Sequence, residues 1–587
     1  MTRLTSVVAI LVVLESCADA IVHTKEFPHS AVLMDRDRFT LFWEHDDSTV
    51  TMEIHVQVAS GWIGLGISHN GGMTGSDVIM GWMADGKTVF SDRYAAGEYL
   101  PEVDDTQDWE LQGMSLQDSY TVLTARRPIK TCDKQDVTIS DTTVRIIYAY
   151  GPLDASGKPT KHTVRGSRSI QIINPNSGAR PALPASTITW ELLNPNTTVP
   201  PTDTTYWCHI FKLPKLSTKH HVIKVEPVIQ LGNEAFVHHI LVYACWLPVN
   251  ASYAGTGHEC FGENMPDDFR HCRIVIFAWA VGGGPQYWED HVGYPFGHEG
   301  SPDFVVMETH WDNPNLRSDF VDGSGIRVYL TPELRQYDAG ILETGLIPWK
   351  LHVIPPKFPD LSSYGFCPQE CLKQGMVRAE VSEIKVMGAI LHSHLLGVSI
   401  TLRHIRDGKE LPPILSDPSY DFNFQEYYPT RQEVTVKAGD ELLVECVYNS
   451  EKREQATVGG ISTREEMCLA FLVYYPAIPL TVCNTAPTPR QTLSFTGSEG
   501  AYTGSQRYVL QDGEYKGMDM YQVVETVDWG QTSSRDAFQR AIRGGEVIPV
   551  CQGATKEAFK VPEVMAIPNV TSWYKAPTYA RNGRRDL

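Results

Sequence analysis

The chain lacks the long apolar runs of a membrane protein and the positive charge excess of a nucleic-acid-binding protein. After the first twenty residues, no stretch reaches the roughly 18 apolar residues that a bilayer-spanning helix requires. The 50 Lys and Arg residues are outnumbered by 70 Asp and Glu residues, which gives a formal net charge of -20. Such an acidic balance disfavours nucleic acid and weakly favours cationic small molecules. We therefore expect no nucleic-acid partner and no membrane span.

Helical patterns are also scarce. Short runs rich in β-branched and aromatic residues dominate, and the turn residues around them are typical of antiparallel β-sandwiches. Only SSRDAFQRAIRGG predicts a helix, because Phe538, Ala541 and Ile542 recur at helical spacing and Gly544 follows as a stop. The sequence thus predicts a mainly β fold. Its clearest predicted strands are residues 39–45, 50–58, 62–68, 144–150, 220–231, 238–245, 304–311 and 441–448.

The 587 residues suggest roughly three to five domains. Pro-rich stretches at residues 174–204, 348–368 and 476–489 punctuate the chain. We place an N-terminal β domain and a linker before two further β-rich blocks and a C-terminal extension. The predicted boundaries are 21–155, 156–204, 205–345, 346–490 and 491–587.

Residues 1–20 predict an export signal. Arg3 precedes the apolar run Val7–Leu14, and Ala18-Asp19-Ala20 fits a cleavage site, so Ile21 would begin the mature chain. The alternative is a short buried strand. The C-terminal sequence YARNGRRDL matches neither an anchor nor a KDEL-type retention signal. We expect a protein of the secretory pathway that is secreted or resides in the lumen of the endoplasmic reticulum or of a vesicle.

Cysteines and sequons fit that route. The chain has 12 cysteines, of which Cys17 would leave with the signal. The others should mostly pair in an oxidising compartment, and their odd number leaves a free thiol or an intermolecular bridge. Asn196, Asn250 and Asn569 each begin an N-x-S/T sequence without an intervening proline, which predicts glycosylation.

Two sets of residues each offer three metal-ligand side chains. The three-histidine set comprises His238 and His239 in HHILVYAC and His310 in METHW; the His–Met set comprises His392 and His394 in LHSHLLG and Met467 in STREEMC. Strand residues at i and i+2 share a face, so the two histidines of LHSHLLG would point the same way. The adjacent histidines of HHILVYAC would face opposite ways, and both reach one metal only if the backbone is bulged there.

Each position also has an ordinary structural explanation. A single histidine on a β face is usually a core or surface residue, and His220 and His221 form a pair without an evident metal role. Met467 lies in a strand-like run where core filling is the default. Three imidazoles suit zinc or copper, whereas a thioether favours Cu(I). The His–Met set therefore indicates a redox copper; a zinc hydrolase would more often recruit a carboxylate and a nearby general base.

In this order and spacing, HHILVYAC, METHWDNP, LHSHLLG and STREEMC resemble the copper type II, ascorbate-dependent monooxygenase family. The N-terminal motifs GWIGLGIS and GSDVIMGWMADGK look like a DOMON domain. A DOMON domain ahead of two copper domains is the arrangement of the dopamine β-hydroxylase-like monooxygenases. The resemblance implies a DOMON β-sandwich over 21–155 and antiparallel, jelly-roll-like β-sandwich copper domains over 205–345 and 346–490.

The resemblance also implies roles for single residues. The three-histidine set matches the copper site that serves electron transfer, and the His–Met set matches the copper that binds oxygen and hydroxylates. Tyr206 and His392 match the two positions assigned as active-site residues. Tyr206 has an equally open structural explanation, because it lies beside Trp207 and Cys208 in a strand that a disulfide would pin.

The family pattern implies disulfides as well: Cys208–Cys260, Cys245–Cys272, Cys367–Cys483 and Cys446–Cys468, with Cys371 then able to reach Cys551. Cys132 belongs to none of these pairs, whereas in dopamine β-hydroxylase a disulfide links the DOMON domain to a C-terminal cysteine. Because the family pattern gives Cys132 no such bridge, it predicts neither how the N-terminal domain docks nor how two chains would contact each other. A homodimer is one possible assembly.

The implied reaction is hydroxylation of a C–H bond in a small substrate, with a phenylethylamine-like amine as the class that the family offers. Ascorbate would supply one electron to each of two copper ions, and O2 would give one atom to the substrate and one to water. The alternative is a non-catalytic secreted copper-binding protein that keeps the fold, against which the intact ligand positions count. A weaker alternative gives the DOMON domain a haem or sugar, with His69 and Met73 as loop ligands for haem.

Overall fold

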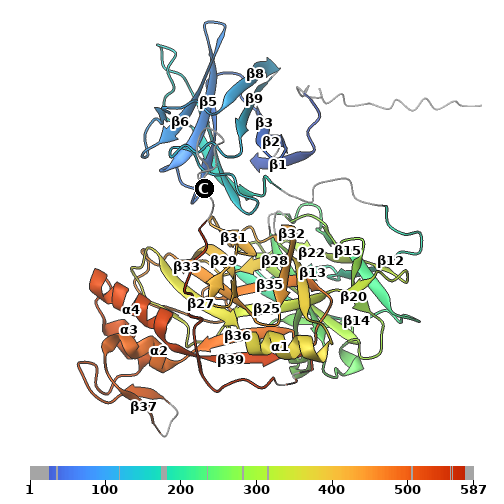
Figure 1. Cartoon of the computed structure of the whole chain (residues 1–587). Coiled ribbons are helices and arrows are strands. Elements are labelled where there is room, and N and C mark those ends of the chain that lie inside the picture. The colour runs from blue at the N-terminus through green and yellow to red at the C-terminus, as the bar shows by residue number, and fades with distance from the viewer. Residues whose placement is uncertain are drawn as a thin grey trace, which may run out of the picture. The chain divides into compact units, whose positions relative to one another are not determined.

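The computed structural model describes residues 25–575, apart from residues 35–37, 118, 174–181, 235, 281–282, 314–315, 504–506, 556 and 558. The predicted signal and its cleavage before Ile21 lie outside the described residues. The chain divides into two compact units, an N-terminal unit of residues up to Thr138 with Ile146–Arg168, and a larger unit of Ile139–Arg145 with residues from Ser169 onward. Strands dominate both units, so the predicted mainly β fold is confirmed (Figure 1).

Two β-sheets build the N-terminal unit. In spatial order, the first contains β1 (His29–Met34), β2 (Phe39–His45), β3 (Thr49–Val56), β9 (Tyr120–Pro128) and β8 (Glu110–Gln117). The second contains β11 (Val164–Ile170), β10 (Val144–Gly151), β4 (Trp62–Ser68), β5 (Ser76–Ala84), β6 (Lys87–Ala95) and β7 (Glu102–Val103). Met73 packs against the buried cluster around Trp62 and Trp82, whereas His69 is exposed. Core packing therefore accounts for Met73.

The first half of the larger unit contains two sheets whose residues share one buried cluster. One sheet has the order β12 (Ile188–Leu193), β23 (Gly325–Thr331), β15 (His220–Val228), β20 (Val292–Phe296) and β24 (Tyr337–Asp338), with β19 (Gln286–Tyr287) paired to β15. The other has the order β17 (Gly257–Glu259), β14 (Thr204–Lys212), β21 (Phe304–Asp312), β16 (Val237–Cys245) and β18 (Cys272–Ala280). Smaller elements are β13 (Thr197–Thr198), β22 (Val321–Asp322), η1 (Ala251–Tyr253) and η2 (Asp267–His271).

The second half repeats the two-sheet plan around its own buried cluster. Its longer sheet has the order β32 (Tyr427–Lys437), β28 (Glu383–His392), β35 (Cys468–Tyr475), β25 (Gly340–Leu346), β36 (Val482–Pro487), β39 (Glu546–Gln552) and β40 (Met565–Ala566). Its shorter sheet has the order β27 (Leu361–Cys367), β33 (Asp440–Tyr448), β29 (Gly397–Arg406) and β30 (Lys409–Glu410), with β31 (Leu415–Asp417) paired to β29. Small two-stranded pairs are β26 (Val353–Ile354) with β34 (Thr457–Val458), and β37 (Gly500–Tyr502) with β38 (Tyr508–Leu510).

The two sheets of the second half meet in a close backbone contact at two glycines. A Cβ atom built on Gly365 of β27 would lie 2.1 Å from the backbone carbonyl carbon of Gly345 in β25. Gly345 itself has a φ of +137°, where a side chain is strained. Only glycine fits this contact.

The helices include one that the sequence predicts and others that it does not. The predicted helix is confirmed as α4 (Thr532–Gly544), which buries Phe538 and ends at the predicted Gly544. The spacing of apolar residues does not predict α1 (Gln369–Arg378), because this helix is short and weakly amphipathic and contains Gly375. The other unpredicted helices are α2 (Pro489–Leu493), η3 (Ser494–Thr496) and α3 (Met520–Thr526).

Three predicted segments differ from the structure. Within the linker 156–204, β11 extends a sheet of the N-terminal unit and β12 pairs with β23, because short strands survive between prolines. The block 205–345 includes β25, which pairs with β35 and β36 of the second half. The C-terminal extension 491–587 contributes β39 to the same sheet, paired along β36, so it is part of the second half rather than an appendage. The pairs β20–β24 and β25–β36 are parallel within otherwise antiparallel sheets.

Five disulfides cross-link the larger unit, and they are the pairs that the resemblance implies. They are Cys208–Cys260, Cys245–Cys272, Cys367–Cys483, Cys371–Cys551 and Cys446–Cys468. Cys132 is exposed and lies outside these five pairs. The predicted glycosylation positions Asn196, Asn250 and Asn569 are all exposed. A glycan at each is compatible with the fold.

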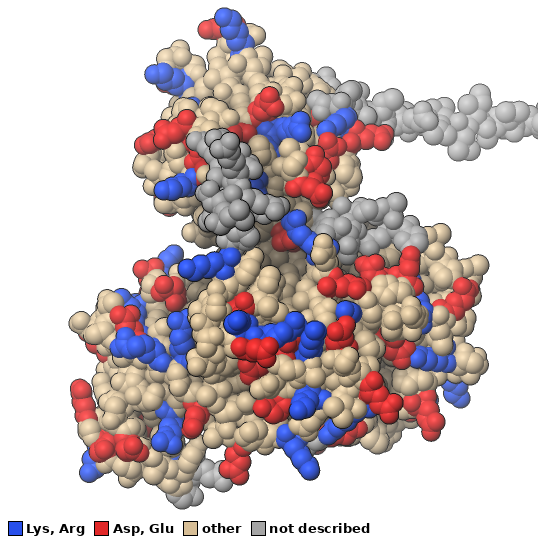
Figure 2. All heavy atoms as spheres, in the orientation of Figure 1, with Lys and Arg blue, Asp and Glu red and all other residues tan. Residues whose placement is uncertain are grey.

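The two halves of the larger unit share part of their core. Met387, Val473 and Tyr475 belong to the second half but pack into the buried cluster of the first. Within the described part of the chain, no helix has the length and apolar character needed to cross a bilayer. On the face that Figure 2 shows, Lys and Arg side chains are interspersed with Asp and Glu side chains.

Candidate metal centres

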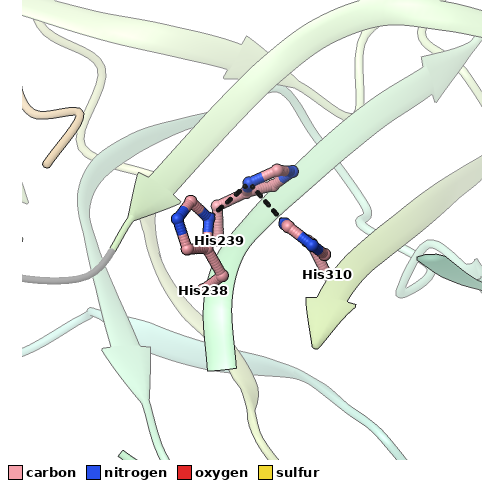
Figure 3. A group of neighbouring side chains, drawn as sticks. All are labelled: His238, His239 and His310. Carbon is pink, nitrogen blue, oxygen red and sulfur yellow. Dashed lines mark hydrogen bonds between the residues drawn. The ribbon is translucent and has the colours of Figure 1, made fainter. Parts of the chain in front are cut away.

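The three-histidine set lies on two neighbouring strands of the first half. His238 and His239 are in β16 and His310 is in β21. Val237 pairs with Trp311 and His239 pairs with His310, so the ladder shifts and His238 is the extra residue of a β-bulge. This confirms the expectation that the backbone is irregular at the adjacent histidines. The bulge lets both rings turn toward His310 (Figure 3).

The spacing of the nitrogens fits a metal ion. His239 Nδ1 lies 3.2 Å from His238 Nδ1 and 3.3 Å from His310 Nδ1. Two donors bound to one metal at about 2 Å are separated by about 3–4 Å. His310 Nε2 is buried without a hydrogen-bond partner among the described residues. These three residues therefore fit a metal that takes imidazole ligands.

Burial keeps these imidazoles neutral. Desolvation lowers the pKa of His238 and of His239 to about 4, with His239 adding to the effect on His238. Desolvation, followed by the neighbouring His239 and His238, holds the pKa of His310 far below its ordinary range. Lone pairs are therefore available to a metal at neutral pH, because no proton has to leave.

The outer nitrogen of His238 has a hydrogen-bond partner and that of His239 lies near a carboxyl group, whereas that of His310 has no hydrogen-bond partner among the described residues. His238 Nε2 lies 3.2 Å from Asn423 Oδ1, which belongs to the second half. His239 Nε2 lies 3.7 Å from Glu308 Oε1. Burial raises the pKa of the Glu308 carboxyl to about 7. Partners of this kind fix the tautomer and direction of a metal-ligating histidine.

The His–Met set begins at the end of β28. His392 is the last residue of that strand, and His394 lies just beyond it rather than within it. The two rings are nevertheless 5.2 Å apart between centroids, so the structure brings them together. Desolvation, followed by His394, lowers the pKa of His392 to about 3; desolvation lowers that of His394 to about 4. Each Nδ1 donates to an oxygen, at 2.5 Å to Gln425 Oε1 and at 2.9 Å to the Glu465 carbonyl, which leaves each Nε2 lone pair available.

A buried carboxyl group places Met467 beside His394. Glu466 Oε2 accepts from the backbone N–H of His394 at 2.9 Å and of Met467 at 3.3 Å. It also accepts from Ser393 Oγ at 3.0 Å, while Glu466 Oε1 accepts from the Leu396 N–H at 2.6 Å. The register is compatible with this, because the β28–β35 ladder ends with His392 paired to Leu469, and His394 and Met467 each lie two residues beyond that pair. Desolvation raises the pKa of Glu466 to about 7.

The two sets are neighbours across the two halves. Phe422 of the second half stacks on His238 at a centroid distance of 4.8 Å and meets His394 edge-on at 5.8 Å. The set members also affect one another electrostatically, since His394 contributes to the lowered pKa of His310. One aromatic ring therefore contacts a ligand residue of each set.

Tyr206 lies at the three-histidine set. It pairs with His310 across β14 and β21, and the two rings stack at a centroid distance of 4.5 Å and an angle of 11°. Burial and the Glu308 carboxyl raise the pKa of its phenol well above the ordinary range, so the hydroxyl stays protonated. Tyr206 also packs against the cluster around Cys208, so both explanations of this residue describe real contacts.

His220 and His221 have structural partners instead of a metal geometry. His221 Nε2 donates to Asp338 Oδ1 at 2.8 Å, and its Nδ1 accepts from the backbone N–H of Arg335 at 3.0 Å. His220 Nδ1 donates to the Thr218 carbonyl at 2.7 Å. No local sequence pattern predicts Glu466, Asn423 or Gln425 as site residues. The one signal is an acidic residue inside the run that carries Met467.

Two imidazole sets lie on paired β-sandwich halves, and a methionine adjoins one of them; this donor chemistry fits a copper oxidoreductase. Comparisons with known proteins agree. Family models match residues 190–318 as "Copper type II ascorbate-dependent monooxygenase, N-terminal domain", residues 337–496 as the C-terminal domain, and residues 35–151 as "DOMON domain". The chain belongs to the copper type II ascorbate-dependent monooxygenase family. It is a monooxygenase with copper as its cofactor and ascorbate as its electron donor.

Named relatives span most of the chain. It is 36% identical to human "DBH-like monooxygenase protein 1" over 560 residues, which covers 94% of this chain and 90% of the relative. Identity to the chicken protein of the same name is 38% over 513 residues, 86% of this chain and 83% of the relative. Identity to rat "Dopamine beta-hydroxylase" is 34% over 468 residues, 78% of this chain and 74% of the relative.

Copper binding to the three-histidine set is expected to depend weakly on pH. An imidazole with a pKa of about 6.5 is mostly protonated at pH 5.5, whereas imidazoles near or below 4 are neutral there. The apparent dissociation constant for Cu(II) should rise at most about tenfold between pH 7 and 5.5, mainly through protonation of Glu308. An exposed three-histidine peptide should lose about 500-fold. Chelator competition on a His394→Ala variant measures this, and a loss as steep as the peptide's would contradict it.

Proposed function

We propose that this protein hydroxylates a C–H bond of a small amine in the secretory pathway, with O2 and ascorbate as co-substrates. One observation carries the proposal: two imidazole sets with different third donors adjoin the same ring, Phe422, within one compact unit. An all-imidazole set suits a metal that exchanges electrons. A set with a weak thioether suits Cu(I) that keeps a position open for a substrate.

The proposed roles follow the two sets. The three-histidine set would hold the copper that passes electrons, and the His–Met set would hold the copper at which hydroxylation takes place. Copper at these positions supplies electron transfer and oxygen activation, which amino-acid side chains do not perform. The chain's residues hold the donors in place, since Asn423, Gln425 and the Glu465 carbonyl orient the rings. Tyr206 and His392 are the proposed active-site residues, with the Tyr206 ring covering one side of His310.

A half-buried carboxyl group near the His–Met set supports an amine as substrate. Glu343 of β25 lies directly opposite Phe471 of β35, and the Phe471 ring is 6.5 Å from that of His392. Among the described residues, Glu343 has no cationic partner; Asn484 Nδ2 donates to it at 2.6 Å. Burial raises the pKa of this carboxyl. An ammonium group would compensate the buried charge and add a charge-assisted hydrogen bond.

The cross-linking pattern supports the secretory pathway. The five disulfides of the larger unit need an oxidising compartment to persist. Three exposed sequons provide accessible positions for glycans. The N-terminal export pattern agrees with both features. We propose that the mature protein is secreted or resides in the lumen of the endoplasmic reticulum or of a vesicle.

The direct test combines copper analysis with ascorbate-dependent oxygen consumption across phenylethylamines and their neutral, uncharged analogues. We expect two copper ions per chain, uptake of O2 that requires an amine, and one atom of labelled oxygen in the product. Two coppers without substrate-dependent uptake would support the non-catalytic copper-binding alternative instead. Equal turnover of neutral and cationic analogues would remove the amine from the proposal but keep the reaction class.

A charge-removing variant tests the amine more closely. Glu343→Gln should raise KM for amines by about tenfold or more and leave neutral analogues unaffected, because a charge-assisted hydrogen bond is about 1.5–3 kcal/mol. Glu441→Gln is the matched control, since Glu441 is another carboxyl with a pKa raised by burial, close to Glu370. An equal effect of both variants would contradict the role of Glu343.

A further inference from the structure

One short segment of the second half contacts a ligand residue of each set. Residues 421–425, called here the bridging segment, precede β32 and contain a turn closed by pairing of Asp421 with Phe424. Its Asn423 Oδ1 lies 3.2 Å from His238 Nε2, and its Gln425 Oε1 lies 2.5 Å from His392 Nδ1. A single piece of chain therefore supplies the outer hydrogen-bond partner of a histidine in both sets.

The contacts of the two amides fix which way each amide points. Asn423 Nδ2 lies 3.4 Å from Asp421 Oδ1, and Gln425 Nε2 lies 2.7 Å from the Phe422 carbonyl oxygen. Carboxylate and carbonyl oxygens only accept, so each amide must turn its NH2 group toward them and its oxygen toward the imidazole. An amide oxygen also only accepts. His238 must therefore carry its proton on Nε2, and His392 must carry its proton on Nδ1.

These tautomers leave the correct nitrogens for a metal. His238 Nδ1, which faces His239 Nδ1 at 3.2 Å, keeps its lone pair toward the three-histidine set. His392 keeps its lone pair on Nε2, the nitrogen that is not bonded to Gln425, and its ring lies 5.2 Å from that of His394 between centroids. With the opposite tautomer, each histidine would aim an N–H at the metal and place two acceptors against each other at the amide.

The bridging segment is itself held through Asp421. Asp421 Oδ2 accepts from Arg145 Nη1 at 3.2 Å and from Ser169 Oγ at 2.6 Å, while Oδ1 accepts from the Asn423 backbone N–H at 3.0 Å. Arg145 also donates from Nε to the Ser419 carbonyl at 3.2 Å and from Nη2 to the Tyr420 carbonyl. Two residues earlier, Thr143 Oγ1 donates to the buried Asp417 at 2.6 Å. Arg145 thus contacts three consecutive residues, 419–421, of which the last, Asp421, begins the bridging segment.

We infer that Arg145, acting through Asp421, is a positioning residue that sets the tautomers of His238 and His392 and thereby prepares both metal sets at once. The inference rests on the proposed two-copper function and adds residues that belong to neither set. Asn423 serves one set, Gln425 serves the other, and Arg145 serves both. This division gives a pattern that general destabilisation does not produce.

The test measures Cu(II) dissociation constants by chelator competition in two full-length backgrounds. The double variant His394→Ala with Met467→Leu leaves the three-histidine set, and the double variant His239→Ala with His310→Ala leaves His392, His394 and Met467. Loss of an outer-shell partner typically weakens metal binding about 10–100-fold. Asn423→Ala should weaken copper by that amount only in the first background, and Gln425→Ala only in the second. Arg145→Gln should weaken copper about tenfold in both.

Arg431→Gln is the matched control, because Arg431 pairs with Asp141 at 2.7 Å, on the same 139–145 segment, and does not contact the bridging segment. It should leave both dissociation constants within about threefold of the backgrounds. If Arg145→Gln behaves like Arg431→Gln, or if Asn423→Ala and Gln425→Ala each weaken both sets equally, the inference is wrong while the proposed function stands. If the parent chain and both backgrounds bind no copper, the proposed function and the inference fail together.

Discussion

Replacing Glu466 by alanine is expected to empty the His–Met set of copper and to lower the free energy of unfolding by about 3 kcal/mol or more. The carboxyl group is 1% exposed and accepts hydrogen bonds from three backbone N–H groups and the Ser393 hydroxyl. Alanine leaves these donors buried without partners, at about 1–3 kcal/mol for each unsatisfied group. The loop that carries His394 and the residue just before β35, Met467, then lose their common anchor. Copper analysis should fall from two ions per chain to one, and thermal unfolding should shift downward.

Glu465→Ala is the control for that experiment. Its backbone carbonyl, which the substitution keeps, accepts from His394 Nδ1; its side chain accepts from the Ser462 N–H at 3.2 Å. The neighbouring substitution should therefore keep two coppers and the parent stability within about 1 kcal/mol. Two tightly bound coppers and an unchanged midpoint in Glu466→Ala would show that the four hydrogen bonds do not position the ligands.

The second large effect is expected from Met467→Leu. Leucine keeps the volume and apolar character of the side chain, so stability should change by less than about 1.5 kcal/mol. It removes the soft donor that favours Cu(I). Amine-dependent oxygen consumption should fall by at least about 100-fold, the scale on which a small misplacement of the reacting centre acts. Copper at the three-histidine set should still be reduced by ascorbate at the parent rate.

Met387→Leu separates this effect from loss of a methionine as such. Met387 lies on β28, the strand that ends at His392, but it is buried in the core shared by the two halves. The same substitution there should leave oxygen consumption within about twofold of the parent. Parent-like turnover in Met467→Leu, or an equal loss in both variants, would contradict the role given to the thioether.

The sequence predicts the central strands of this fold, whereas it does not predict strands such as β12 and β39 near the sheet edges. Each of the eight predicted runs coincides with a strand, because β-branched and aromatic residues specify a pleated, buried surface. Two runs are predicted too long: residues 50–58 overrun β3, which ends at Val56, and residues 220–231 overrun β15, which ends at Val228. The six residues of β12 pair on one side only and sit among prolines, so their local pattern is weak. The strand β39 forms by pairing along β36, and more than fifty residues separate the two strands in the sequence. Local composition therefore does not predict β39.

The site residues likewise divide into those that the sequence predicts and those that it does not. Histidines and a methionine are rare enough at such spacing that their chemistry is readable, and even the bulge at His238 followed from two adjacent ligands having to face one metal. Glu466, Asn423 and Gln425 are ordinary polar residues whose importance arises from what lies opposite them. Their contacts are tertiary, spanning 33 residues between Gln425 and His392 and 185 between Asn423 and His238. No local pattern encodes such distances.

The placement of the 139–145 segment limits how this protein can be cut or recombined. By sequence it follows β9 and ends with the first two residues of β10, Val144 and Arg145, yet by contact it groups with the larger unit and brings Thr143 and Arg145 to the loop before β32. A truncation that begins at the DOMON boundary would discard these two side chains together with the sandwich that carries them. The bridging segment of the larger unit is therefore expected to keep its place only when residues 139–145 are retained with that unit.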